Sequence, residues 1–264
     1  MKRTVSAYLD TKLSGRTKMI FSVAAAKGLP LERESLSVTV NGARVEPVEV
    51  ADAHGTRLHQ LVADGGQVAL RYDAVVTGQA DPPPVFDLDL ITYLRPSRYC
   101  ESDTLGPTAV SEFAGLQDKD LLRAVSDWVS DKLVYVTGSS LPTDGAVRTL
   151  MARQGVCRDF AHLCIALLRA LNVPARLAAV YAPGLSPMEF HAVAEAYVDG
   201  AWYVVDATRL APRQSLLRVA TGRDAADTAF LTNYWSGLQL TGLEVTAVVD
   251  NFGTEDGRGL LQLR

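Results

Sequence analysis

The stretch of sequence that decides the fold is RQGVCRDFAHLCIALLRALNVPAR, which runs from Arg153 to Arg176. Its apolar residues recur at helical spacing and predict an amphipathic helix over residues 158–171. Asn172 and Pro174 end this helix, because asparagine tolerates the left-handed conformation at a helix end and proline cannot continue a helix. Cys157 therefore lies where a loop becomes a helix.

The position of Cys157 suits a nucleophile. The first backbone N–H groups of a helix have no partner within the helix, and the positive end of the helix dipole lies there. Both effects favour the thiolate, which is the nucleophilic form, and the same N–H groups can stabilise an oxyanion. Plain packing is the alternative explanation. Cys164 lies on the apolar stripe and is expected in the core, and Cys100, in a loop-like segment, is expected to be structural.

A hairpin further along supplies a histidine and an acid. The segment HAVAEAYVDGAWYVVDAT predicts two strands joined by Asp199-Gly200 as a two-residue turn. Counting back from that turn makes His191 and Asp206 diagonal neighbours on one face of the sheet. A carboxylate there can orient the imidazole and leave its other nitrogen for a thiol. A β-bulge would break this register, and a structural core histidine is the alternative for His191.

The other three histidines have plainer explanations. His54 and His59 lie in a turn and a strand of the N-terminal part and are expected at the surface. His162 is expected on the polar face of the helix. Cys157, His191 and Asp206 therefore form the one set that supports acyl transfer, in which a thiolate attacks a carbonyl, forms a thioester and releases the acyl group to a second nucleophile.

The first hundred residues predict strands. ESLSVTVNGARVEPVEV holds Asn41-Gly42, a strong hairpin signal, and further strand-like runs follow at regular spacing up to Pro82-Pro83-Pro84. Helical periodicity replaces this pattern over residues 120–133 and 143–154. We therefore expect an α+β protein, with a β-sandwich over residues 1–100, a mixed core over residues 101–250 and a C-terminal tail over residues 251–264 that folds back or frays.

Composition narrows the classes of function. The chain has 264 residues, 48% of them hydrophobic and 21% charged, with a net charge of −4. Nucleic acid is therefore not an expected partner, and no apolar run is long enough to span a membrane. The N-terminus lacks the apolar stretch of a signal peptide, and three cysteines do not suggest a disulfide framework. These features favour a cytoplasmic protein with free thiols. The oligomeric state stays open.

Several motifs resemble the transglutaminase-like superfamily, in particular its bacterial members of cysteine-protease type. GVCRDFAHLCIALLRALNVPAR is similar to the nucleophile segment of that family, and HAVAEAYV and WYVVDATR are similar to its His and Asp segments. LVYVTGSS resembles the stretch before the nucleophile, and YLRPSRYCESD resembles the junction after an N-terminal β-domain. The resemblance covers residues 1–225.

This resemblance implies a papain-like core of helices on an antiparallel sheet, with Cys157 as nucleophile, His191 as base and Asp206 as orienting acid. It implies hydrolysis of peptide or isopeptide bonds, or transfer of a glutamine acyl group to an amine, in either case on a peptide or protein substrate and without a cofactor. Tyr135 becomes a candidate oxyanion donor because its segment matches, and a packed strand tyrosine is the alternative. Asp159 either shapes the substrate site or favours the positive helix end.

Two departures from the family pattern concern substrate contacts. Val193 stands where many relatives have a tryptophan two residues after the histidine, and Ala207 stands where many have a proline after the acid. Neither change removes a catalytic atom. Two other hypotheses compete with the enzyme: a non-catalytic interaction protein that retains the fold, and a zinc site built from Cys157, His162, Cys164 and His191, which lack the spacing of zinc ligands. No acidic loop has the ligand spacing of a calcium site.

Overall fold

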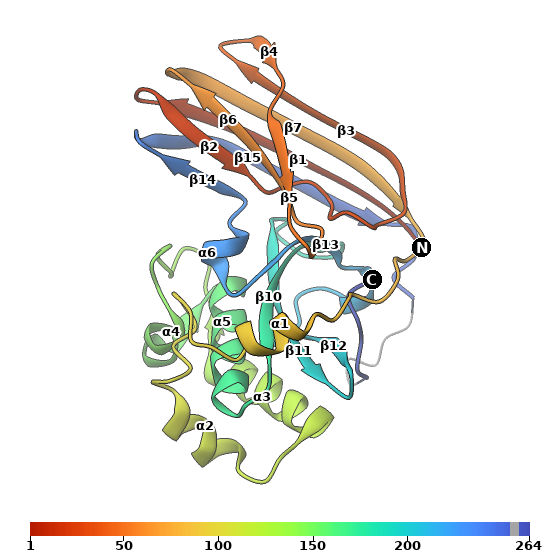
Figure 1. Cartoon of the computed structure of the whole chain (residues 1–264), viewed down its shortest axis with the longest axis vertical. Coiled ribbons are helices and arrows are strands. Elements are labelled where there is room, and N and C mark those ends of the chain that lie inside the picture. Colours follow the sequence, from red (N-terminus) through yellow and green to blue (C-terminus); the bar gives the residue numbers. More distant parts are fainter. Residues whose placement is uncertain (254–258) are drawn as a thin grey trace.

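The computed structural model describes residues 1–253 and 259–264. A β-sandwich lies at one end of the molecule and a mixed helix-and-sheet core at the other (Figure 1). The α+β class and the antiparallel sheets predicted from the sequence are therefore confirmed. In the described part of the chain, none of the helices combines the length and the apolar character needed to cross a membrane.

The sandwich consists of two antiparallel sheets. The first has the order β15 (Leu238–Val249), β1 (Lys2–Leu13), β7 (Gly66–Thr77), β3 (Leu31–Val40) and β4 (Ala43–Val45). The second has the order β14 (Leu231–Tyr234), β2 (Thr17–Phe21), β6 (Arg57–Ala63) and β5 (Val48–Ala51). Strand β1 alternates strictly, so that Val5, Ala7 and Leu9 face the apolar core between the sheets.

Two features of the sandwich test the sequence predictions. Asn41 and Gly42 both have positive φ angles and join β3 to β4, as the hairpin signal predicts. Residues 231–249, which the sequence places in the core, instead pair as β14 with β2 and as β15 with β1. Alternation identifies these segments as strands but does not say which sheet they join, and the free edges beside β1 and β2 accept them.

The core contains a four-stranded antiparallel sheet in the order β12 (Ala201–Val205), β11 (His191–Val198), β10 (Ala175–Tyr181) and β13 (Leu217–Gly222). Helix α5 (Cys157–Ala170) packs on this sheet, with α3 (Asp118–Lys132), α4 (Ala146–Ala152) and α2 (Gly106–Phe113) around it. The helices predicted over residues 120–133, 143–154 and 158–171 are α3, α4 and α5. Helix α6 (Ala225–Thr228), the 3₁₀ turn Arg213–Ser215 and the short parallel pair β8 (Val134–Tyr135) and β9 (Gln154–Gly155) complete the core.

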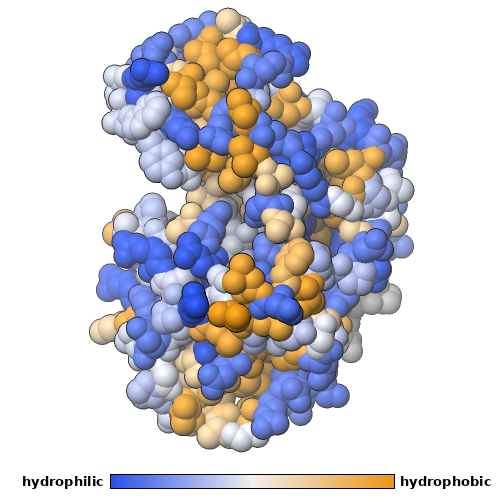
Figure 2. All heavy atoms as spheres, in the orientation of Figure 1, coloured by the Kyte–Doolittle hydropathy of each residue, from blue (hydrophilic) through white to orange (hydrophobic). Residues whose placement is uncertain are grey.

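A connection that includes the three prolines leads from the sandwich into α1 (Asp87–Thr92), a helix too short for its periodicity to be seen in the sequence. Exposed apolar side chains gather over this helix on the face shown in Figure 2, and they belong to Val85, Phe86, Leu88 and Ile91. At the other end of the chain, residues 259–264 fold back on the core. The Leu261 carbonyl accepts the Val204 N–H at 2.7 Å. The rest of the predicted tail, residues 254–258, lies outside the described residues.

His59 and His162 are buried and His54 is half-buried, although the sequence predicted exposure for all three. His162 is fully buried on α5, stacks on Tyr99 and accepts a hydrogen bond from the Ala225 N–H at 3.1 Å. Burial lowers the pKa of His162 to about 3, so it is a neutral acceptor. His54 and His59 lie beside acids, and burial lowers the pKa of each. The predictions were wrong because elements distant in sequence cover these side chains.

Candidate active site

Helix α5 begins at Cys157, as predicted, and the local sequence explains why. Val156 is extended and its N–H donates to Asp159 Oδ2 at 2.8 Å, which fixes the first turn of the helix. A Cβ atom on Gly155 would lie 2.7 Å from the Asp159 Cβ, so glycine is needed for this carboxylate to fold back. Cys157 is 7% exposed, whereas Cys164 on the same helix is fully buried. The prediction that Cys164 is a core residue is confirmed.

Asp159 and its neighbour Arg158 organise the loop beside the nucleophile. Asp159 is fully buried, and its Oδ1 accepts from Arg158 Nη2 at 3.2 Å. The same guanidinium nitrogen donates to Ser140 Oγ at 2.6 Å and to the Leu141 carbonyl at 2.8 Å. These bonds favour the second of the two roles considered for Asp159, that of stabilising the helix end rather than contacting substrate.

The predicted hairpin register is present without a bulge. Val198 pairs with Ala201 across the turn, and the ladder continues regularly to Ala194 and Val205. This register brings His191 Nε2 to 3.9 Å from Asp206 Oδ2, which is an ion-pair distance rather than a hydrogen bond. The two side chains therefore share one face of the hairpin end, as predicted.

Thr208 holds the acid in place, and the sequence analysis did not assign it this role. Its hydroxyl donates to Asp206 Oδ1 at 2.7 Å, and its backbone N–H donates to the same oxygen at 2.9 Å. The Thr208 hydroxyl also lies 3.4 Å from His191 Nε2 and can accept from it. The available signal was a threonine two residues after an aspartate, a spacing at which aspartate commonly bonds the following backbone.

Burial and charge make the pair of His191 and Asp206 chemically unusual. Burial lowers the pKa of His191, but its interactions with Asp206 and Cys157 outweigh burial and raise it to about 10. Burial alone would raise the pKa of Asp206, but the interactions with His191 and the hydrogen bonds from Thr208 outweigh burial, so the pKa is lowered. Within the described residues, His191 Nδ1 and Asp206 Oδ2 have no hydrogen-bond partner. The structure thus brings His191 close to both Asp206 and Cys157 and leaves the Nδ1 atom of its ring without a hydrogen bond in the described chain.

Tyr135 lies beside the nucleophile, on β8. Its hydroxyl donates to Glu189 Oε1 at 2.9 Å, and its ring contacts Phe160 at a centroid distance of 5.9 Å. Burial, then the charge of Cys157 and the bond to Glu189, raise the pKa of Tyr135 above its usual range, whereas the Cys157 backbone N–H opposes this shift. Sequence reasoning missed Glu189, whose only signal is its place two residues before His191.

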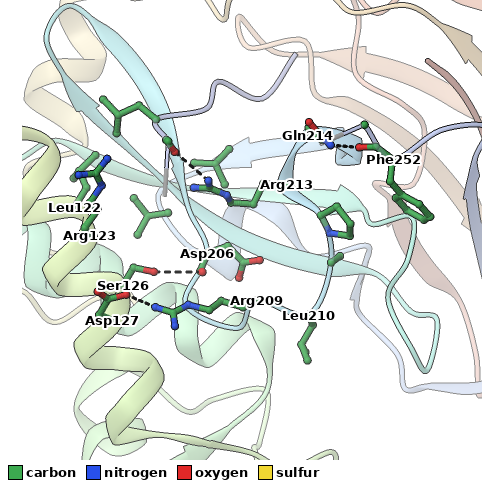
Figure 3. Close-up of a pocket in the computed structure, with 17 residues that line it drawn as sticks. Leu122, Arg123, Ser126, Asp127, Asp206, Arg209, Leu210, Arg213, Gln214 and Phe252 are labelled. Atoms are coloured by element: carbon green, nitrogen blue, oxygen red, sulfur yellow. Dashed lines mark hydrogen bonds and ion pairs between the residues drawn. The ribbon is translucent and has the colours of Figure 1, made fainter. Parts of the chain in front are cut away.

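A cavity of about 450 Å³ lies on another side of Asp206 (Figure 3). Residues of α3 and of the segment after β12 line it, and Ser126 Oγ there donates to the Asp206 carbonyl at 3.3 Å. Neither Cys157 nor His191 is among its lining residues, so it is separate from the point of attack. Among the residues that the structure describes, no three His, Cys, Asp or Glu side chains are grouped to hold a metal ion.

Comparisons with known proteins agree with this arrangement. The model of the transglutaminase-like superfamily matches residues 110–207, a range that includes Cys157, His191 and Asp206. A crystal structure from Cytophaga hutchinsonii, described as that of a candidate cysteine protease, is 35% identical and superposes with a TM-score of 0.88. That match covers 97% of this chain and 92% of the other chain.

Two curated relatives come from mycobacteria, and neither has a characterised function. The Mycobacterium leprae protein is 28% identical over 137 residues, which are 48% of this chain and 48% of that protein. The Mycobacterium tuberculosis protein is 40% identical over 65 residues, which are 25% of this chain and 19% of that protein. The matched region thus spans half or less of these relatives. The family-model match over residues 110–207, together with the match to the Cytophaga structure over nearly the whole of both chains, shows that this protein belongs to the transglutaminase-like superfamily.

Proposed function

We propose that this protein catalyses thiol-dependent acyl transfer on amide bonds, by hydrolysis of a peptide or isopeptide bond in a peptide or protein substrate. Cys157 is the nucleophile, His191 the proton carrier and Asp206 the orienting acid. The observation that carries the proposal is that the two nitrogens of the His191 ring have different surroundings. Nε2 faces Asp206 and Thr208, whereas Nδ1 has no hydrogen-bond partner in the described chain.

The reaction follows from this geometry in two steps. The Cys157 thiolate attacks the amide carbon, and backbone N–H groups at the start of α5 stabilise the negative charge that develops on the carbonyl oxygen. The C–N bond breaks as the His191 imidazolium gives its proton to the leaving amine, which leaves a thioester on Cys157. Water then attacks the thioester as His191 takes one of its protons, which releases the carboxylic acid and restores the Cys157 thiolate beside the His191 imidazolium.

Asp206 and Thr208 support the histidine without touching the substrate. An imidazole that donates its Nε2–H toward this pair is held in the tautomer and orientation that direct Nδ1 at the thiol. The carboxylate also stabilises the imidazolium that the first step requires. Because the three cysteines are all free thiols in the structure, we place this reaction in a reducing compartment such as the cytoplasm.

Two alternatives use the same fold. A primary amine can replace water as the acceptor of the thioester, which would make the protein a transglutaminase. A non-catalytic interaction protein would keep the fold without an activated thiol. The first experiment separates the enzyme from the interaction protein, and the products formed with and without an added amine separate the two reactions.

The experiment is iodoacetamide alkylation of Cys157 as a function of pH, followed by peptide mass spectrometry. The wild type should be alkylated at Cys157 at pH 6, because a charged His191 stabilises the thiolate, and His191→Ala and His191→Asn should lose this reactivity. Cys164, which is fully buried, is the internal control in every sample. A Cys157 that is inert at pH 6 in the folded wild type would overturn the proposal and favour the interaction protein.

A further inference from the structure

Glu189 is held beside the nucleophile by its neighbours on both sides. Met188 and Phe190 pack against the sandwich core, and Phe190 stacks on Phe230 at a centroid distance of 5.2 Å. Glu189, between them, instead reaches Tyr135 of β8 and accepts its hydroxyl hydrogen at 2.9 Å. The carboxylate is half-buried, so it is accessible to a ligand and also partly shielded from solvent.

The charge of Glu189 is not balanced within the described residues, where it forms no ion pair. The side chain that approaches it, Tyr135, also contacts Cys157, so one phenol separates the carboxylate from the nucleophile. Arg158, next to Cys157 in sequence, is occupied by Asp159, Ser140 and the Leu141 carbonyl. The charged His191 balances the Cys157 thiolate, so the half-buried Glu189 carboxylate beside them has no counter-charge of its own, and a cation bound there would stabilise it.

We propose that Glu189 is a specificity-determining residue that binds a cationic group, an ammonium or a guanidinium, carried by the substrate next to the scissile amide. The assignment of this group to a substrate rests on the proposed function. The preference of the site for a cation does not, because it can be measured on the thiol alone.

The bond to Tyr135 gives this binding a consequence for the reaction. A phenol has one hydrogen to donate, and in the structure Tyr135 donates it to Glu189. A cation that takes over the carboxylate releases that hydrogen, and the Tyr135 hydroxyl can then donate to the oxyanion that forms at Cys157. A cationic substrate should therefore have a higher kcat as well as a lower KM than an uncharged one.

The test compares three methanethiosulfonate reagents of matched size: a trimethylammonium ethyl, a sulfonatoethyl and a neutral alkyl derivative. In each reaction the Cys157 thiolate attacks the sulfenyl sulfur, forms a mixed disulfide and expels methanesulfinate. The rates of the same three reagents with a small free thiol in solution correct for the intrinsic reactivity of each reagent, and the neutral reagent separates attraction of the cation from repulsion of the anion. Mass spectrometry locates the adduct, since Cys100 and Cys164 are also present but fully buried.

The wild type should react with the cationic reagent at least tenfold faster than with the anionic one after this correction. Glu189→Gln should reduce that ratio by about tenfold, since it removes one charge at close range in a partly desolvated site. Asp131→Asn, which removes an exposed carboxylate from the end of α3, is the matched control and should leave the ratio unchanged. A ratio near one in the wild type, or a ratio that Glu189→Gln leaves intact, overturns the proposal.

Peptide substrates then locate the cationic group. Each peptide carries lysine on the acyl side or on the leaving-group side of the scissile amide, with norleucine at the same place as the uncharged control. A lysine preference on one side that Glu189→Gln abolishes supports the proposal and identifies that side, whereas equal turnover of all lysine and norleucine pairs overturns it for substrates. If no peptide is cleaved while the reagent preference persists, the proposed hydrolysis fails and the cation site stands.

Discussion

Strand β11 carries two buried ionic clusters that differ in how completely they are bonded. His191 and Glu195 lie four residues apart, so their side chains point to the same face. The Glu195 carboxylate accepts a hydrogen bond from Arg176 Nε at 2.9 Å and two from the guanidinium of Arg218 at 2.8 and 2.6 Å, so both of its oxygens are bonded. His191 meets Asp206 only at 3.9 Å and keeps an unused ring nitrogen.

The difference separates a structural cluster from the cluster that we propose to be reactive. Burial alone would raise the pKa of Glu195, but the charges of Arg218 and Arg176 outweigh burial and lower the pKa to about 2. Both carboxylate oxygens already accept hydrogen bonds from these arginines, so Glu195 has no place for another partner. Arg176 Nη1 in the Glu195 cluster also lacks a hydrogen bond, but it lies 3.7 Å from Asp89 Oδ2. At His191 and Asp206 the acid and the base themselves each keep an unbonded buried atom, which native structures rarely allow unless a ligand or a reaction uses it. The open cluster is therefore the one suited to chemistry.

Replacing the acid in each cluster gives the largest predicted contrast. Asp206→Asn should lower kcat by roughly a thousandfold or more, because the amide no longer holds His191 in the required tautomer and charge state. Glu195→Gln should leave kcat per folded molecule within a few-fold of wild type. It should lower the free energy of unfolding by about 3–5 kcal/mol, because two buried arginines lose their counter-charge.

Peptide hydrolysis and denaturant unfolding of the two variants check this contrast. Glu112→Gln on α2 serves as an exposed acid-to-amide control and should change neither measurement strongly. Loss of activity in Glu195→Gln at full folding, or full activity in Asp206→Asn, would mean that the two clusters have been assigned to the wrong roles.

The reactive cluster could be found from sequence because its determinants are local. A two-residue turn fixed the register of His191 and Asp206, and helical periodicity with Gly155 before it located Cys157. The pairing of Cys157 with His191 came from the family resemblance as well, since periodicity alone does not bring a helix end to a strand end.

The structural cluster and the details around the site could not be found in this way. Glu195 and Arg218 come from different strands, and their bonds depend on the sheet order β11-β10-β13, which no turn or spacing encodes. The contact between Tyr135 and Glu189 likewise joins segments 54 residues apart. The predicted exposure of His54, His59 and His162 was wrong for the same reason, because the elements that cover these side chains are distant in sequence.

The pH dependence of activity sharpens the comparison further. The pKa of His191 is raised to about 10, so the imidazolium that the proposed mechanism needs to protonate the leaving amine persists as the pH rises to that value. We expect kcat/KM to hold through pH 9 and to fall above about pH 10. Asp206→Asn removes one of the interactions that raise this pKa, so its alkaline limb should move to lower pH. A wild-type limb near pH 7 would contradict the charged His191.

The raised pKa of His191 also makes the stability of the fold depend on pH. A raised pKa means that the folded state binds the proton more tightly than the unfolded chain does. The stabilisation is complete below about pH 6.5, the value for an unperturbed histidine, and is lost as the pH rises toward 10. Thermal unfolding of the wild type between pH 7 and 10 should show this loss, and His191→Gln should not show it.

The smallest predicted effect concerns Thr208, which links the two members of the open cluster. Thr208→Val removes the hydroxyl that donates to Asp206 Oδ1 and lies near His191 Nε2, but it keeps the backbone N–H bond to the same carboxylate oxygen. Loss of one side-chain hydrogen bond of about 1 kcal/mol corresponds to a decrease in kcat of about fivefold, with KM unchanged. Thr208→Ser retains the hydroxyl and should recover most of the rate, which a packing role of the threonine methyl group would not allow. If valine keeps the wild-type rate, the backbone N–H alone orients Asp206, and if serine is as impaired as valine, the hydroxyl is not what Asp206 and His191 require.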